Sequence, residues 1–110
     1  MIYQIEMKNE SNGMEYLKKT ITYPFTQELV DNLKKVIPSN IVSGDIKVSL
    51  FIIRPGSLSL KNISLNEFTK NRKEVFSLTM DDASALKIYG DLYDFVQAIP
   101  PYFKMEQTLV

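Results

Sequence analysis

The longest amphipathic segment of the chain runs from Thr79 to Ile99. On a helix at 100° per residue, its apolar side chains fill one continuous arc of roughly 180°. The arc contains Phe95, Ile88, Ile99, Leu92, Ala85, Val96, Tyr89, Tyr93 and Leu86. Thr79 is a suitable N-cap, and Pro100–Pro101 ends the helix. The negative charges of Asp81 and Asp82 are favourable in the first turn of a helix. We therefore expect most of the hydrophobic core to lie beneath this helix.

Alternating apolar and polar positions predict strands in the first half of the chain. Residues 2–8 alternate, the sequence NESNG at 9–13 is typical of a turn, and alternation resumes over 17–25. These segments predict an N-terminal hairpin that ends near Pro24. Residues 46–54 (IKVSLFIIR) become apolar on both faces, which is typical of a central or covered strand.

A second helix is predicted over residues 27–37. Its apolar side chains recur with helical spacing, Thr26 is a suitable N-cap, and Pro38 follows the last turn. The segment 57–73 fits two interpretations: a strand over 58–68 that begins a second hairpin, or a short helix introduced by Ser64. Residues 74–80 alternate again and predict the last strand.

These elements predict an α+β fold in the order β-β-α-β-(β)-β-α. The sheet is mostly antiparallel, with about five strands formed by two hairpins and a central strand, and two helices pack on one face. The open face is expected to carry polar side chains, namely Lys18, Thr20, Thr22, Lys47 and Ser49.

Composition narrows the class of protein. The 110 residues suffice for a single domain over 1–110, and the 45% hydrophobic content is typical of a globular chain. The formal net charge is zero, which disfavours non-specific nucleic-acid binding. The longest apolar run, Leu50 to Ile53, is far too short to span a bilayer, so the expected location is the cytoplasm.

The sequence lacks the residues on which most catalytic and transition-metal sites depend. It contains no histidine and no cysteine. The close carboxylate pairs, Asp81–Asp82 and Asp91/Asp94, fit a helix N-terminus and a solvated helix face. We therefore expect no enzyme, no cofactor and no metal site.

Nucleic-acid binding is one alternative function. Lys70, Arg72 and Lys73 form a basic cluster that could contact phosphates, and tyrosines on a sheet could stack on bases of a single strand. A charged loop that keeps a hairpin soluble explains the same residues.

Protein contact is the function that the sequence favours. Tyr89 and Tyr93 lie at one margin of the helical arc, and Tyr102, Phe103 and Met105 follow in an apolar tail over 102–110. We expect a non-enzymatic interaction protein, typical of a phage-like accessory or inhibitor protein of a mobile element. Its partner would be another protein or a second copy in a homodimer. An assembly or virion component is a further alternative.

Overall fold

Four segments with alternating side chains form a four-stranded antiparallel sheet in the order β2-β1-β3-β4. The structure is a computed structural model, and it describes residues 1–53 and 71–101. Its elements are β1 (Ile2–Asn9), β2 (Glu15–Thr22), α1 (Thr26–Val36), β3 (Ile46–Ile53), β4 (Arg72–Met80) and α3 (Asp82–Gln97).

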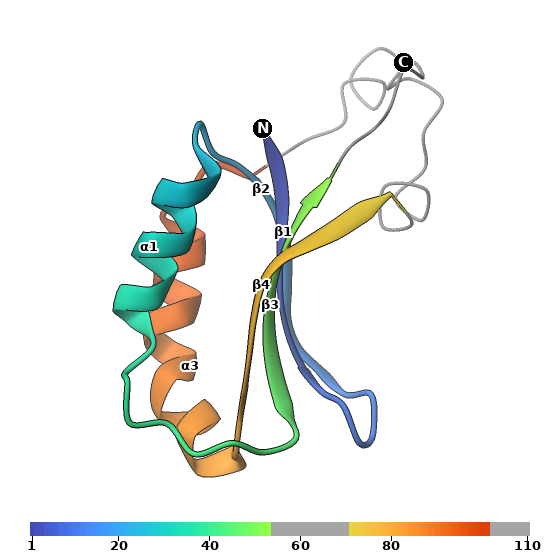
Figure 1. Ribbon diagram of the computed structural model, residues 1–110, viewed down its shortest axis with the longest axis vertical. Coiled ribbons are helices and arrows are strands. Elements are labelled where there is room, and N and C mark those ends of the chain that lie inside the picture. Colours follow the sequence, from blue (N-terminus) through green and yellow to red (C-terminus); the bar gives the residue numbers. More distant parts are fainter. Residues whose placement is uncertain (54–70, 102–110) are drawn as a thin grey trace.

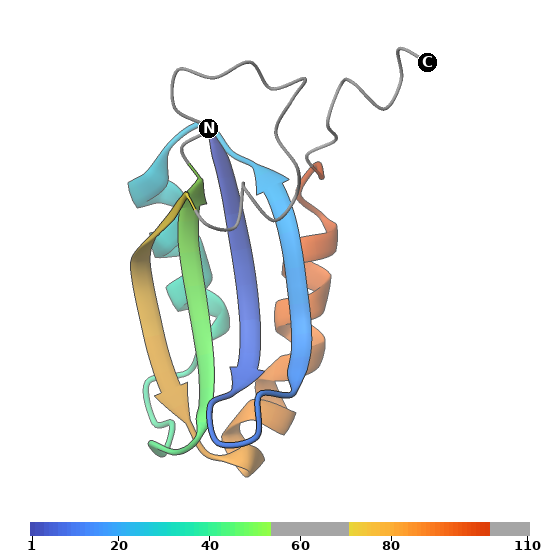
Figure 2. The same cartoon turned by 90° about the vertical axis from the view of Figure 1, so that its right-hand side faces the viewer.

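Both helices lie on the same face of the sheet, so the described residues form two layers (Figure 1). Helix α3 runs behind β1 and β2, whereas α1 runs behind β3 and β4 (Figure 2). Strands β2 and β3 are both antiparallel to β1, which lies between them, and are therefore parallel to each other. Such a pair needs a crossover connection, and α1 supplies it.

The core lies between the helices and the sheet. On the central strands, Tyr3, Ile5 and Met7 of β1 face the helices together with Val48 and Leu50 of β3. All of these side chains are buried. Helix α3 contributes Ala85, Ile88, Leu92 and Val96, and α1 contributes Leu29, Val30 and Leu33. The core therefore lies beneath both helices, whereas the sequence led us to expect most of it beneath α3.

The predicted α+β class, the antiparallel sheet and the two helices are confirmed, and β3 is central as expected. The described residues 1–53 and 71–101 form four strands. About five strands were predicted for the whole chain. The extra strand over 58–68, like its helical alternative, lies outside the described residues.

Both predicted helix caps are wrong by one or two residues. Phe25 occupies the N-cap of α1 and makes no side-chain cap bond. The Thr26 hydroxyl instead lies 2.7 Å from the hydroxyl of Tyr3, whose ring is buried. A buried hydroxyl needs a hydrogen-bond partner, and this need outweighs capping. Helix α3 is capped by Asp81, because β4 continues through Met80 and includes Thr79.

Ser49 differs from the expected polar, solvated face of the sheet. It is only 2% exposed, although it points away from the helices. Ser49 is paired with Glu6 of β1 and Ser77 of β4 in the middle of the sheet, so larger neighbours shield its short side chain.

Candidate functional site

One margin of α3 carries a row of side chains that the sheet does not cover. Asp82, Leu86, Tyr89 and Tyr93 follow one another at helical spacing along this margin. Tyr89 lies next to the edge strand β2, since its hydroxyl bonds to Tyr16. Leu86 is 80% exposed, Tyr89 37% and Tyr93 43%. The rings of Tyr89 and Tyr93 stack with centroids 6.2 Å apart. We call these four residues the α3 margin.

Leu86, which the sequence places in the apolar arc of this helix, is not buried. Ala85 and Leu92 lie nearer the middle of the arc and are buried, whereas Leu86 lies at its end. A helix packed on a sheet buries a stripe narrower than half its circumference. The apolar arc of α3 is therefore wider than the surface beneath it, and its last members remain accessible.

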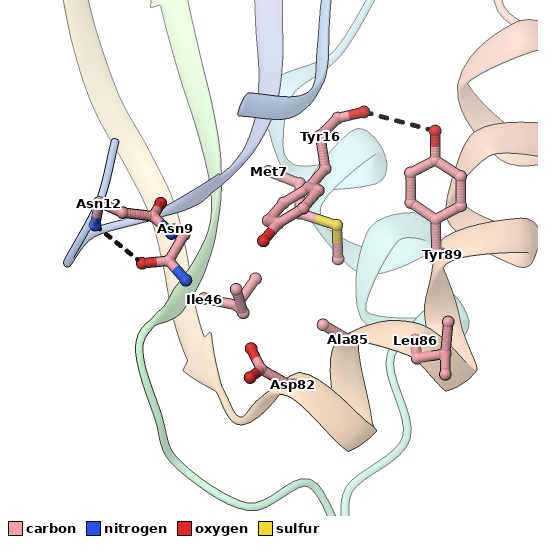
Figure 3. A pocket seen from close by; sticks show the side chains of 9 residues that line it. All are labelled: Met7, Asn9, Asn12, Tyr16, Ile46, Asp82, Ala85, Leu86 and Tyr89. Carbon is pink, nitrogen blue, oxygen red and sulfur yellow. Dashed lines mark hydrogen bonds between the residues drawn. The ribbon is translucent and has the colours of Figure 1, made fainter. Parts of the chain in front are cut away.

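A pocket opens next to the α3 margin (Figure 3). Its volume is about 560 Å³. The lining residues are Met7, Asn9, Asn12, Tyr16, Ile46, Asp82, Ala85, Leu86 and Tyr89. Met7, Ile46 and Ala85 are buried and supply apolar surface, whereas Tyr16 and Tyr89 are partly exposed. The pocket is therefore apolar inside, aromatic at its sides and polar at its edges.

The hairpin between β1 and β2 supplies the polar side of the pocket. Asn9 Oδ1 accepts hydrogen bonds from the backbone N–H groups of Ser11 and Asn12, and Asn12 Oδ1 accepts one from Met14. Gly13 adopts the positive φ, +75°, for which the Asn-Gly pair is suited. These bonds fix the loop through the amide oxygens of both asparagines, whose side chains line the pocket.

Tyr16 reaches the pocket because of a β-bulge. Met7 pairs with Leu17 and Lys8 pairs with Glu15, so Tyr16 has no partner on β1. Leu17 pairs with Met7 and faces the helices, so strict alternation would place Tyr16 on the other face of the sheet. The bulge instead redirects the Tyr16 side chain toward the pocket. The Tyr89 hydroxyl donates a hydrogen bond to the Tyr16 carbonyl oxygen at 3.3 Å. The sequence shows alternation but no sign of this bulge, so sequence reasoning did not find Tyr16 as a pocket residue.

Two adjacent carboxylates at the start of α3 have different roles. Asp81 caps the helix and accepts a hydrogen bond from the Ser84 backbone N–H at 2.8 Å, which lowers the pKa of Asp81. Asp82 lies in the first turn and lines the pocket. Within the described ranges, no hydrogen bond or ion pair joins the Asp82 carboxylate to another side chain.

The predicted basic cluster does not form one patch in the described part of the chain. Lys70 lies outside that part. Arg72 pairs with Ile53 and Lys73 with Ile52, so their side chains point to opposite faces of the sheet. The nucleic-acid role of these residues remains a prediction.

Arg72 makes contacts within the sheet. Its Nη1 donates hydrogen bonds to Gln4 Oε1 at 2.6 Å and to Glu6 Oε2 at 3.2 Å. Its guanidinium carbon lies 3.8 Å from the ring centroid of Phe51. Nearby on the same face, Lys47 forms an ion pair with Glu74 at 3.0 Å, and this hydrogen bond raises the pKa of Lys47.

The other predicted residues are partly outside the described chain. Tyr89 and Tyr93 are placed together on the α3 margin, whereas Tyr102, Phe103 and Met105 lie outside residues 1–53 and 71–101. Asp91 and Asp94 are exposed on α3. Across the described residues, no group of three His, Cys, Asp or Glu side chains could hold a metal ion. Neither described helix is long and apolar enough to cross a membrane.

Comparison with protein-family models, curated proteins and solved structures gives no match.

Proposed function

We propose that this protein acts by binding another protein through the pocket and the α3 margin. The observation that carries this proposal is the exposure of three large apolar side chains, Leu86, Tyr89 and Tyr93, on one helix margin beside a pocket. Contiguous exposed apolar surface of this kind typically marks an interaction site in a water-soluble domain. Tyrosine is also among the residues enriched at binding hot spots.

The energetics of this surface favour association. Burying Leu86, which is 80% exposed, would contribute roughly 1.5–3 kcal/mol before ordering costs. Those costs are small for the tyrosines, because Tyr89 is held by its hydrogen bond to Tyr16 and by the stacked ring of Tyr93. A surface that is already ordered loses little entropy when a partner binds.

A photo-crosslinking experiment tests this proposal. A benzoylphenylalanine at position 86 is irradiated in the cells that make the protein, and the same residue at position 91 is the control. Leu86 lies on the proposed surface, whereas Asp91 is exposed on the opposite side of the same helix. We expect a discrete crosslinked species at position 86 and none at position 91.

The purified partner then allows a quantitative measurement. Tyr89→Ala should weaken its binding roughly tenfold or more, as truncation of a hot-spot tyrosine does. Asp91→Ala should leave the affinity unchanged. A crosslinked species of twice the chain mass would identify the partner as a second copy. Equal crosslinking at both positions, or none at position 86, would contradict the proposal.

A further inference from the structure

We propose that the pocket binds an arginine side chain of the partner, together with a neighbouring apolar side chain of the same segment. This inference rests on the proposed function, because it names the chemistry of the partner at the same surface. It follows from the charge, the aromatic walls and the size of the pocket.

The charge of the pocket favours a cation. Of the residues that line it, only Asp82 belongs to the charged residue types. Its carboxylate makes no ion pair within the described ranges, and the adjacent Asp81 adds a second negative charge. Figure 3 shows the Asp82 carboxylate directed toward the space below Tyr16, so an incoming cation could reach it from the pocket.

The aromatic walls favour a planar cation. The rings of Tyr16 and Tyr89 border the pocket on the side opposite Asp82 (Figure 3). A guanidinium group can stack on an aromatic face and donate two hydrogen bonds to one carboxylate, whereas an ammonium group cannot do both with the same geometry.

The same chain already contains an arginine that lies over an aromatic ring and pairs with a carboxylate, although its second hydrogen bond goes to Gln4. The guanidinium carbon of Arg72 lies 3.8 Å from the Phe51 ring centroid, and its Nη1 lies 3.2 Å from a Glu6 oxygen. The pocket offers the matching groups, tyrosine rings and the Asp82 carboxylate, to an arginine from outside.

The size of the pocket favours a segment over a single side chain. Its volume of about 560 Å³ lies within the range of small-ligand sites and exceeds what one side chain fills. Met7, Ile46 and Ala85 provide an apolar surface for the arginine stem and for an adjacent aliphatic side chain. The amide NH₂ groups of Asn9 and Asn12 can donate hydrogen bonds to backbone carbonyl groups of the bound segment.

The inference is tested by titrating the full chain with capped dipeptides and monitoring the NMR chemical shifts of its backbone amides. The probe is acetyl-Leu-Arg-amide, and the matched control is acetyl-Leu-citrulline-amide, which has nearly the same shape and no charge. We expect the arginine probe to shift Tyr16, Ala85 and Leu86 and to bind roughly fivefold more tightly than the citrulline control. Asp82→Asn should remove this difference, whereas Asp91→Asn should leave it intact.

The inference would be overturned by equal affinity of the two dipeptides, by an unchanged difference in Asp82→Asn, or by shifts confined to residues outside the pocket. If the amide resonances of the pocket residues shift when only the protein concentration is raised, the pocket binds a second copy of the chain. That result would also overturn the inference. Crosslinking at position 86 that persists while the dipeptides fail would overturn only the arginine assignment. Absence of any crosslinked species at position 86 would overturn the proposed function itself.

Discussion

At the scale of single residues, Gly44 shows how closely the chain is packed near the pocket. A Cβ atom built on Gly44 would lie 2.5 Å from Asp81 Cα and 2.7 Å from Met80 O, both backbone atoms. The segment that contains Gly44 is also bound to the junction of β4 and α3, since Asp81 N–H donates to the Val42 carbonyl at 2.7 Å. This contact fixes the start of α3, and therefore Asp82, relative to β3.

The same substitution at two glycines should have opposite effects on stability. Gly44→Ala should destabilise the protein by about 1–3 kcal/mol, because backbone atoms must move to admit the methyl group. Gly90→Ala should stabilise it by about 0.5–1 kcal/mol, since Gly90 lies inside α3 and its Cβ would meet nothing within 4 Å. Urea unfolding of both variants checks this pair, and a stabilised Gly44→Ala would show that the contact with Asp81 is wrongly placed.

At the scale of elements, α3 serves two purposes with one apolar arc. The middle of the arc, including Leu92 and Val96, is fully buried and holds the helix on the sheet. The end of the arc forms the α3 margin and is accessible. The buried side of α3 therefore stabilises the fold, and its accessible margin is the proposed binding surface. Substitutions on the buried side should change stability, whereas substitutions on the margin should change binding.

Leu92→Ala should cost on the order of 2–4 kcal/mol of stability, because it leaves a cavity beneath α3. Lys87→Ala should cost a few tenths of a kcal/mol, since Lys87 is exposed on the same helix. The free energies of unfolding in urea compare the two variants directly. Equal midpoints would mean that the helix is not packed as described.

At the scale of the whole molecule, the open face of the sheet is connected by side chains far apart in the sequence. Arg72 of β4 bonds to Gln4 and Glu6 of β1 and stacks on Phe51 of β3. The Glu6 side chain is 7% exposed, so its negative charge needs the positive charge of Arg72 beside it. The cluster links three of the four strands on the face that α1 and α3 do not cover.

Arg72→Ala should destabilise the protein by about 3 kcal/mol, because it leaves the buried Glu6 carboxylate without its partner. The exposed neighbour Lys73 supplies the control, and Lys73→Ala should have almost no effect. The double variant Glu6→Gln with Arg72→Ala should be less destabilised than the sum of its single changes. Additive effects in thermal or urea unfolding would contradict the proposed coupling.

The sequence by itself determined the elements and their general arrangement. Alternation over residues 2–8 and 46–54, and helical periodicity over 27–37 and 79–99, identified secondary structure that the structure confirms with small shifts at the ends. These patterns are local, because each arises from the repeat of a strand or a helix and from the need to bury one face. The sequence also showed that Tyr89 and Tyr93 lie at one margin of the arc.

Only the tertiary structure decided the pocket and the role of Arg72. Tyr16 joins the pocket through a bulge that depends on pairing between β1 and β2, and Leu86 is exposed because the sheet ends beneath that side of α3. Arg72 looked like part of a basic surface, yet its partners Gln4, Glu6 and Phe51 come from other strands. Strand register and the width of the covered surface are set by contacts between distant segments, which periodicity along one segment does not encode.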